Sequence, residues 1–249
     1  MAQSRVVRPS NGRNSASGKF SGLDGLATGL YIAVALISGL VPVLAIPALA
    51  ALVPDPAVRV YLLNLVFYGL VGAIALLAAW PFVVRGVRAL SARPWFTLGM
   101  IPLAIIAMLI LTAVLAVIAG SARISVNQQG LESLLMAVPA WLMVPVLVVI
   151  APFVEEYIFR HLLIGKLRRY INAWFCYLLS VALFAAIHLV GREALTAGAL
   201  APYLAMGAVL VFAYVRSGGN LMFSYTVHAA KNLLAVLLIY AVPAALLSH

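Results

Sequence analysis

Long apolar stretches, separated by short polar segments, follow one another along most of the chain. They cover residues 26–53, 58–84, 95–119, 133–160, 173–190, 197–215 and 220–247. A helix needs about 20 apolar residues to cross a bilayer, and the alternation typical of transmembrane β-strands is not found. The pattern predicts an all-α fold, a polytopic transmembrane helical bundle of about seven spans, within a range of roughly six to eight. Prolines inside the stretches are expected to kink or split helices, and these are Pro42, Pro47, Pro102, Pro145 and Pro152.

Composition excludes a soluble protein. Hydrophobic residues make up 65% of the 249 residues and charged residues only 9%, whereas soluble domains are about half apolar and a quarter charged. The net charge of +10 indicates topology here rather than a nucleic-acid partner, because Lys and Arg collect in cytoplasmic loops. Successive exposed segments contain four, one, three, one, four, one and one of these cations. This alternation predicts a multi-pass protein of a cell membrane with its N-terminus in the cytoplasm.

The order of polar and apolar segments divides the chain into three regions. Residues 1–25 are rich in Ser, Asn, Gly and Arg and are expected to form a disordered basic cytoplasmic tail. Residues 26–132 form the N-terminal transmembrane helices, and residues 133–249 form a transmembrane core that holds the candidate catalytic residues. The single cysteine, Cys176, excludes an internal disulfide and a cysteine-based zinc site.

Two adjacent acids interrupt an apolar stretch. Of the six acidic residues, Glu155 and Glu156 follow a long apolar run, whereas the other four are expected in the tail or in loops: Asp24, Asp55, Glu132 and Glu193. An ionised side chain at mid-membrane costs roughly 2.5–3.5 kcal/mol, so an intramembrane carboxylate indicates a functional site. The alternative is that the two glutamates anchor a helix end at the membrane interface.

The two glutamates are expected to have different partners. Glu156 and Arg160 are four residues apart and can form an ion pair on one helical face. Glu155 is rotated by about 100° and stays available as a free carboxylate. Pro152 suits the opening turn of a helix or a kink that orients Glu155.

Other polar residues lie in apolar surroundings near the chain's C-terminal end. His188 ends one apolar run, and His228 and Asn232 share a helical face in the last stretch. Each has a structural alternative, as a hydrogen-bonded core histidine or as a contact between helices. Lys231 is expected to snorkel or to form an ion pair, although contact with a substrate is an alternative. No role is expected for His161 or His249.

Register brings these residues together. If the chain reverses near residue 171, Glu155 lies 16 residues before the turn and His188 lies 17 after it. In antiparallel helices they would have nearly the same depth. His228 lies about eight residues, or ~12 Å, beyond the turn at residues 217–220. We therefore expect a polar cluster of Glu155, His188, His228 and Asn232 in the cytoplasmic half of the membrane.

Such a cluster suits hydrolysis of an amide. Glu155 could act as general base on a water molecule that His188 helps to hold, while His228 and Asn232 donate hydrogen bonds to the oxyanion. Alternatively, Glu155, His188 and His228 could bind zinc with an open position for water. The residue types fit either chemistry.

Three motifs resemble those of a known family. Residues 155–160 match Glu-Glu-x-x-x-Arg, residues 184–188 match Phe-x-x-x-His, and residues 228–232 match His-x-x-x-Asn. In order and spacing they resemble the CAAX-protease and bacteriocin-processing (CPBP or ABI) family of intramembrane endopeptidases, over about residues 140–240. The resemblance implies that Glu155 and His188 activate water, that His228 and Asn232 form the oxyanion site, and that Glu156 and Arg160 support the first motif.

The resemblance also implies a substrate class. Family members cleave peptides or membrane proteins, are often described as metalloproteases, and in prokaryotes are associated with bacteriocin processing, self-immunity, signalling or export. A prokaryotic inner or plasma membrane is therefore expected, with zinc as a possible cofactor. His161 departs from the family, which commonly has glycine there. Two other functions stay open: a non-catalytic membrane adaptor or immunity protein of the same fold, and a proton-coupled transporter that uses Glu155 and His188 as a relay.

Overall fold

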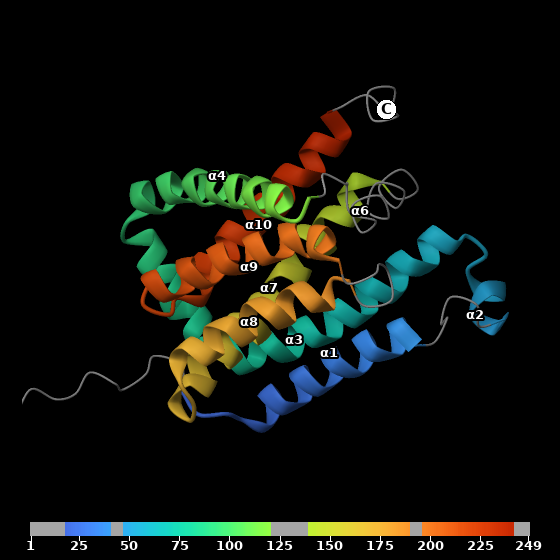
Figure 1. Cartoon of the computed structure of the whole chain (residues 1–249). Coiled ribbons are helices and arrows are strands. Elements are labelled where there is room, and N and C mark those ends of the chain that lie inside the picture. Colours follow the sequence, from blue (N-terminus) through green and yellow to red (C-terminus); the bar gives the residue numbers. More distant parts are fainter. Residues whose placement is uncertain (1–17, 41–46, 121–138, 190–195, 242–249) are drawn as a thin grey trace, which may run out of the picture.

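The computed structural model describes residues 18–40, 47–120, 139–189 and 196–241, and the described part of the chain is helical throughout (Figure 1). Besides one long segmented helix, its helices are α1 (Gly22–Leu40), α2 (Pro47–Leu52), α3 (Pro56–Ser91), α4 (Pro94–Ile118), α8 (Ala173–Ile187), α9 (Ala197–Arg216) and α10 (Leu221–Ala241). The predicted all-α transmembrane bundle is confirmed.

The segmented helix runs from Ala140 to Arg169 and is the most buried of the potential spans. It consists of α6 (Ala140–Val144), the π-helical η2 (Pro145–Ile150), α7 (Ala151–Glu156), the π-helical η3 (Tyr157–Lys166) and the 3₁₀ turn η4 (Leu167–Arg169). Pro145 opens η2, and Pro152 lies in the first turn of α7. Proline lacks a backbone N–H, so the helix changes its hydrogen-bonding register at these residues without ending.

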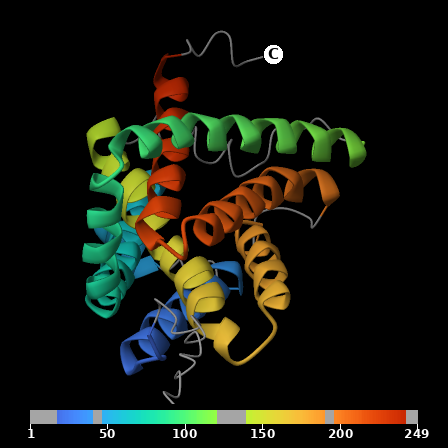
Figure 2. The same ribbon diagram turned by 90° about the vertical axis from the view of Figure 1, so that its left-hand side faces the viewer.

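The remaining helices surround this central one. Helix α7 packs against α3 and α10, and η3 packs against α8, while α9 joins α8, α10 and α4 (Figure 1). Helix α1 packs on α3, and α4 crosses α10 and α9 on the opposite side of the bundle (Figure 2). Side chains of α7 therefore point toward α3 and α10 from the middle of the protein.

The predicted spans agree with the helices except over residues 26–53 and at the end of the 133–160 stretch, where the central helix continues to Arg169. Five described helices are long and apolar enough to cross a membrane, and the apolar segments Gly22–Leu36 and Ala173–Ile187 are shorter. The apolar stretch over residues 26–53 forms two helices instead of one, because α1 ends at Leu40 and Pro47 opens the separate helix α2, which is the split expected at this proline. Proline at the first position of a helix is favourable, whereas inside a helix it is not. Pro102, by contrast, lies within an unbroken α4. Pro42 lies outside the described residues.

The sequence predicted Asp24 in a solvated tail, and this prediction is wrong, because Asp24 is buried in α1. Its side chain is 1% exposed and lies 2.6 Å from the Nζ atom of Lys166. The backbone N–H of Ser21 donates to Asp24 Oδ2 at 2.6 Å, the Asp24 N–H donates to Ser21 Oγ at 3.3 Å, and Tyr157 donates to Oδ1. The reciprocal bonds with Ser21 form a capping box, which starts α1 four residues before the predicted span. Residues 1–17 of the predicted tail lie outside the described part.

Three cations counted as exposed loop charges are also buried. Arg59, in the first turn of α3, is 6% exposed and donates to the Pro54 carbonyl at 3.3 Å. Arg160 is fully buried and Lys166 is 3% exposed, because the central helix continues to Arg169. The turn is confined to residues 170–172, where the reversal near residue 171 was predicted. Arg160 and Lys166 each have a carboxylate partner, Glu156 for Arg160 and Asp24 for Lys166. These pairs allow charge in the apolar bundle.

Replacing Asp24 with Asn should destabilise the bundle, because it leaves the Lys166 ammonium buried without a counter-charge. We expect the free energy of unfolding to fall by roughly 3–5 kcal/mol, measured by detergent-induced unfolding in mixed micelles. Asp55→Asn is the matched control. Asp55 is exposed and caps α3, a role that asparagine fills equally well. Equal losses in the two variants would contradict the buried pair.

Candidate functional site

Glu155 and Glu156 lie at the C-terminal end of α7, with 6% and 0% of their surfaces exposed. Being adjacent on a helix, they point in different directions, and the structure gives them different partners. Glu156 faces two cationic or polar groups that hold it in place. Glu155 faces a group of polar side chains drawn from α3, the end of α8, and α10.

Glu156 forms the predicted ion pair. Its Oε1 atom lies 3.2 Å from Arg160 Nη1 and also 3.0 Å from His228 Nδ1. Arg160 also donates from Nη2 to the carbonyl of Gly207 at 3.3 Å, and its guanidinium stacks over the Phe184 ring, 4.3 Å from the ring centroid. One buried carboxylate therefore ties the central helix to α10, while its arginine contacts α8 and α9.

Glu155 meets both histidines, as the register had predicted. Its Oε2 atom lies 3.8 Å from His188 Nε2 and 3.7 Å from His228 Nε2, while Tyr68 donates to Oε1 at 3.5 Å. The distances to the imidazoles exceed a direct hydrogen bond. The three side chains are 9%, 19% and 2% exposed for Glu155, His188 and His228, so His188 is the most accessible of them.

The ring nitrogens of the histidines have defined roles. His188 terminates α8, and its Nδ1 atom lies 2.7 Å from the carbonyl oxygen of Phe184, which only accepts. Nδ1 must therefore carry the hydrogen, which leaves Nε2 as the acceptor in the neutral ring. The carboxylate of Glu156 holds His228 in the same way, through Nδ1. Both rings thus turn Nε2 toward Glu155.

Asn232 has a structural partner that the sequence had not indicated. Its Nδ2 atom donates to the carbonyl oxygen of Leu147 at 3.0 Å. In η2 the Ala151 N–H bonds to the Val146 carbonyl, so the next N–H in this register would come from residue 152. Pro152 has none. Asn232 therefore fills an acceptor that the proline leaves open, and the second hydrogen of its amide is not used in that bond.

Aromatic residues complete the site, and sequence patterns did not reveal them. Tyr68 contacts Glu155 from α3, and Tyr203 of α9 stacks on the His188 ring at 4.6 Å between centroids. Both lie on apolar helices where tyrosine is unremarkable, so spacing alone could not single them out. Only the position of a tyrosine next to the carboxylate shows that it belongs to the site, and that position is known only once the fold is known.

The remaining candidates lie apart from Glu155 or at its edge. His161 is 1% exposed and packs against the rings of Phe82 and Tyr157, with centroids 4.5 and 5.8 Å away. It is a core residue packed between aromatic rings, in agreement with the absence of any expected role. Lys231 is half-buried and interacts electrostatically with Glu155. Glu132, Glu193 and His249 lie outside the described residues.

The donor types around Glu155 fit zinc. A carboxylate and two imidazoles are common zinc ligands, and here the other ring nitrogen of each histidine is bonded to a carbonyl or a carboxylate, as in many zinc sites. As they are placed, no group of three His, Cys, Asp or Glu residues in the described part of the chain is arranged to hold a metal ion.

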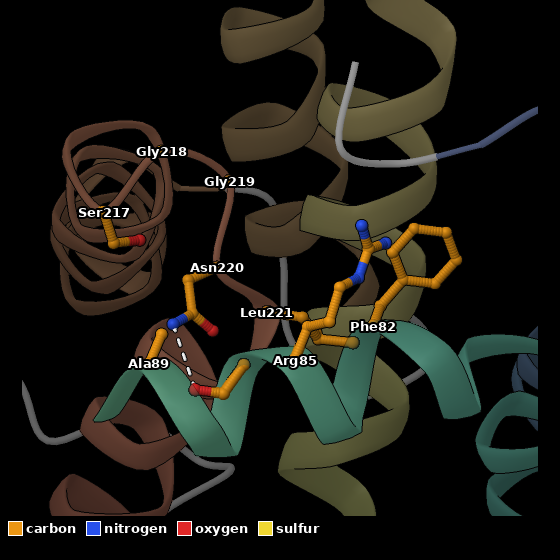
Figure 3. A pocket seen from close by; sticks show the side chains of 9 residues that line it. Phe82, Arg85, Ala89, Ser217, Gly218, Gly219, Asn220 and Leu221 are labelled. Atoms are coloured by element: carbon orange, nitrogen blue, oxygen red, sulfur yellow. Dashed lines mark hydrogen bonds between the residues drawn. The ribbon is translucent and has the colours of Figure 1, made fainter. Parts of the chain in front are cut away.

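A separate hollow of about 170 Å³ lies where the turn between α9 and α10 meets α3 (Figure 3). Arg85 and Phe82 line one side, and residues 217–221 line the other. Asn220 donates to the Gly86 carbonyl at 3.3 Å and caps α10 through Met222 N–H at 3.0 Å. A Cβ atom on Gly86 would lie 2.6 Å from Asn220 Oδ1, so the close approach of this turn to α3 favours glycine at position 86. No predicted site residue lines the hollow.

Sequence comparison covers the same part of the chain. The family described as type II CAAX prenyl endopeptidase, Rce1-like, matches residues 137–234, which include every candidate residue from Glu155 to Asn232. Over 98 residues the chain is 34% identical to YdiL of Bacillus subtilis (strain 168), a membrane peptidase by name. That alignment covers 39% of this chain and 37% of the relative, so it spans little more than a third of the relative's length. No solved structure matches the chain.

The bond between Asn232 and Leu147 can be tested with a double-mutant cycle. Asn232→Ala leaves a backbone carbonyl without its donor, and we expect a loss of about 1–3 kcal/mol in the free energy of unfolding. In a Pro152→Ala background, residue 152 has a backbone N–H that can bond to the Leu147 carbonyl. Asn232→Ala should therefore lower the free energy of unfolding by less in that background. Detergent-induced unfolding of the four proteins gives the coupling. An Asn232→Ala loss that is identical in both backgrounds would contradict this account.

Proposed function

We propose that this chain, whose residues 137–234 match the Rce1-like family of CAAX prenyl endopeptidases, is an intramembrane endopeptidase of the CAAX-protease and bacteriocin-processing family. The observation that carries the proposal is the convergence of two imidazole Nε2 atoms on Glu155 Oε2, at 3.7 and 3.8 Å, inside a bundle of apolar helices. A carboxylate held next to two acceptor nitrogens, away from bulk water, is a suitable base for hydrolysis.

In the proposed first step, a water molecule binds between Glu155 and the two histidines. The gaps to His188 and His228 are too long for direct hydrogen bonds, and a shared water suits them. Glu155 accepts a proton from this water while the water oxygen attacks the carbonyl carbon of the peptide bond. His188 orients the water, and Tyr68 holds the other oxygen of the carboxylate.

The oxyanion then needs hydrogen-bond donors. Asn232 has a second amide hydrogen beyond the one given to Leu147, and His228 donates from Nε2 when its ring carries both hydrogens. Glu156 orients that ring from the opposite nitrogen, with Arg160 supporting the carboxylate. The intermediate collapses as Glu155 returns the proton to the leaving amine, which yields a new carboxyl end and a new amino end.

Zinc is an alternative route to the same reaction. Glu155, His188 and His228 would hold the ion, which when bound supplies a Lewis acid and a more acidic water. Chelation separates the two routes: a zinc enzyme loses activity and regains it when zinc is added back. The route through glutamate alone leaves activity unchanged under chelation.

We also propose a prokaryotic cell membrane as the location and a peptide or a membrane protein as the substrate. The similarity to a protein of Bacillus subtilis supports the first, and a site enclosed by apolar helices supports the second. Bacteriocin processing or self-immunity, signalling and protein export are roles compatible with such a protease.

Replacing the base tests the proposal. Glu155→Gln and His188→Ala should each lower processing by about 10²–10⁴-fold, because the first removes the proton acceptor and the second the water ligand. Both should accumulate in the membrane like the wild type. Membrane proteomes of a deletion strain complemented with each form, compared by labelling of new N-termini, identify the substrate and its cleavage. His249→Ala serves as the histidine control.

Wild-type processing by the Glu155→Gln protein would sink the proposed mechanism. If the deletion changes no N-terminus at all, a non-catalytic adaptor is the better description. A transporter should tolerate Asn232→Ala better than a hydrolase, which loses about 10²–10³-fold in rate with one oxyanion donor.

A further inference from the structure

Lys231 occupies an unusual position for a cation in a transmembrane helix. It lies at the midpoint of α10, whose described ends are Leu221 and Ala241. Each end is about 15 Å away along the axis, which is farther than an extended lysine side chain reaches. Lys231 therefore cannot place its ammonium in the water beyond either end of the helix, as a snorkelling lysine does.

The other buried cations near the site have ion-pair partners, whereas Lys231 has none among the described residues. Arg160 pairs with Glu156 and Lys166 pairs with Asp24. For Lys231 we find no hydrogen bond or ion pair with any residue that the structure describes, and its side chain is half-buried. It interacts electrostatically with Glu155 and with His228. An ammonium in these surroundings is costly unless an anion or a wet cavity compensates it.

Its position on α10 places it beside the proposed reaction centre. Lys231 follows His228 by three residues, so the two side chains lie about 60° apart around the helix. Asn232, the next residue, lies on the other flank of His228. Glu155 already faces Tyr68 and both histidines. The ammonium is thus near the carboxylate without being its ion-pair partner.

We propose that Lys231 binds a carboxylate of the substrate close to the cleaved bond, so that the protein selects peptides with such a group there. The carboxylate is the common anion of peptides, and it pairs strongly with an ammonium in apolar surroundings. It comes from the substrate's C-terminus or from an Asp or Glu side chain. Anchoring that group at Lys231 fixes which peptide bond reaches Glu155. This inference rests on the proposed endopeptidase function.

Binding of synthetic peptides to the full chain in lipid nanodiscs tests the inference. The probes are fluorescein-labelled apolar decapeptides in three forms: a free C-terminal acid, a C-terminal amide, and a C-terminal amide with glutamate near the end. Fluorescence anisotropy against empty nanodiscs reports binding, and mass spectrometry of the same samples reports cleavage. We expect at least one carboxylate form to bind about tenfold or more tightly than the plain amide. The form preferred identifies the source of the carboxylate.

Variants of the lysine decide the assignment. Lys231→Gln should abolish the preference for carboxylate peptides, and Lys231→Arg should retain it. Arg216→Gln removes an equal charge from the exposed end of α9 and should change nothing. Equal binding of acid and amide peptides by the wild type, including no binding of either, overturns the inference, as does a preference that survives in Lys231→Gln. Peptides that bind with the expected preference but are not cut contradict the protease proposal and leave the carboxylate site standing.

Discussion

Two neighbouring carboxylates in an apolar helix need different partners, because both cannot be left with an uncompensated charge. The rest of the site depends on that difference. Glu156 is enclosed by Arg160 at 3.2 Å and by His228 Nδ1 at 3.0 Å. Such a buried pair needs further hydrogen bonds to compensate its desolvation, and the Gly207 carbonyl and the Phe184 ring contribute to this. With one charge neutralised in this way, Glu155 can lie beside it and face the imidazoles instead.

His228 links the two carboxylates. One ring nitrogen faces Glu156 and the other faces Glu155, so the position of the ring follows from the ion pair. The relation resembles the orientation of a catalytic histidine by a buried carboxylate in hydrolases of other folds. Helix α10, which contains His228, is also bonded to the central helix through Asn232. This side chain donates to the Leu147 carbonyl, which Pro152 leaves without a donor. Sequence features that look independent, a proline in one helix and an asparagine in another, therefore support one arrangement.

Much of this arrangement could be predicted from the sequence because it follows from helical periodicity. Four-residue spacing indicated the pair of Glu156 with Arg160, and nearly equal distances from the turn near residue 171 indicated that His188 lies level with Glu155. Contacts between residues far apart in the sequence, which no helical spacing relates, could not be predicted. Tyr68 reaches Glu155 across 87 positions of sequence, and Asp24 reaches Lys166 across 142. Asp24 had been placed in a tail because a charge before an apolar stretch usually lies in water, and only its distant partner makes burial possible.

The central claim is that His228 bridges the two glutamates while His188 approaches only the first. Solid-state NMR of the protein in bilayers, with ¹⁵N-labelled histidine and ¹³C-labelled glutamate side chains, measures this through dipolar couplings between ring nitrogens and carboxyl carbons. We expect one histidine coupled to two glutamates and a second coupled to one, with the strongest coupling from the 3.0 Å contact between His228 Nδ1 and Glu156 lost in Glu156→Gln. Spectra in which no histidine nitrogen couples to a glutamate carboxyl would contradict the account.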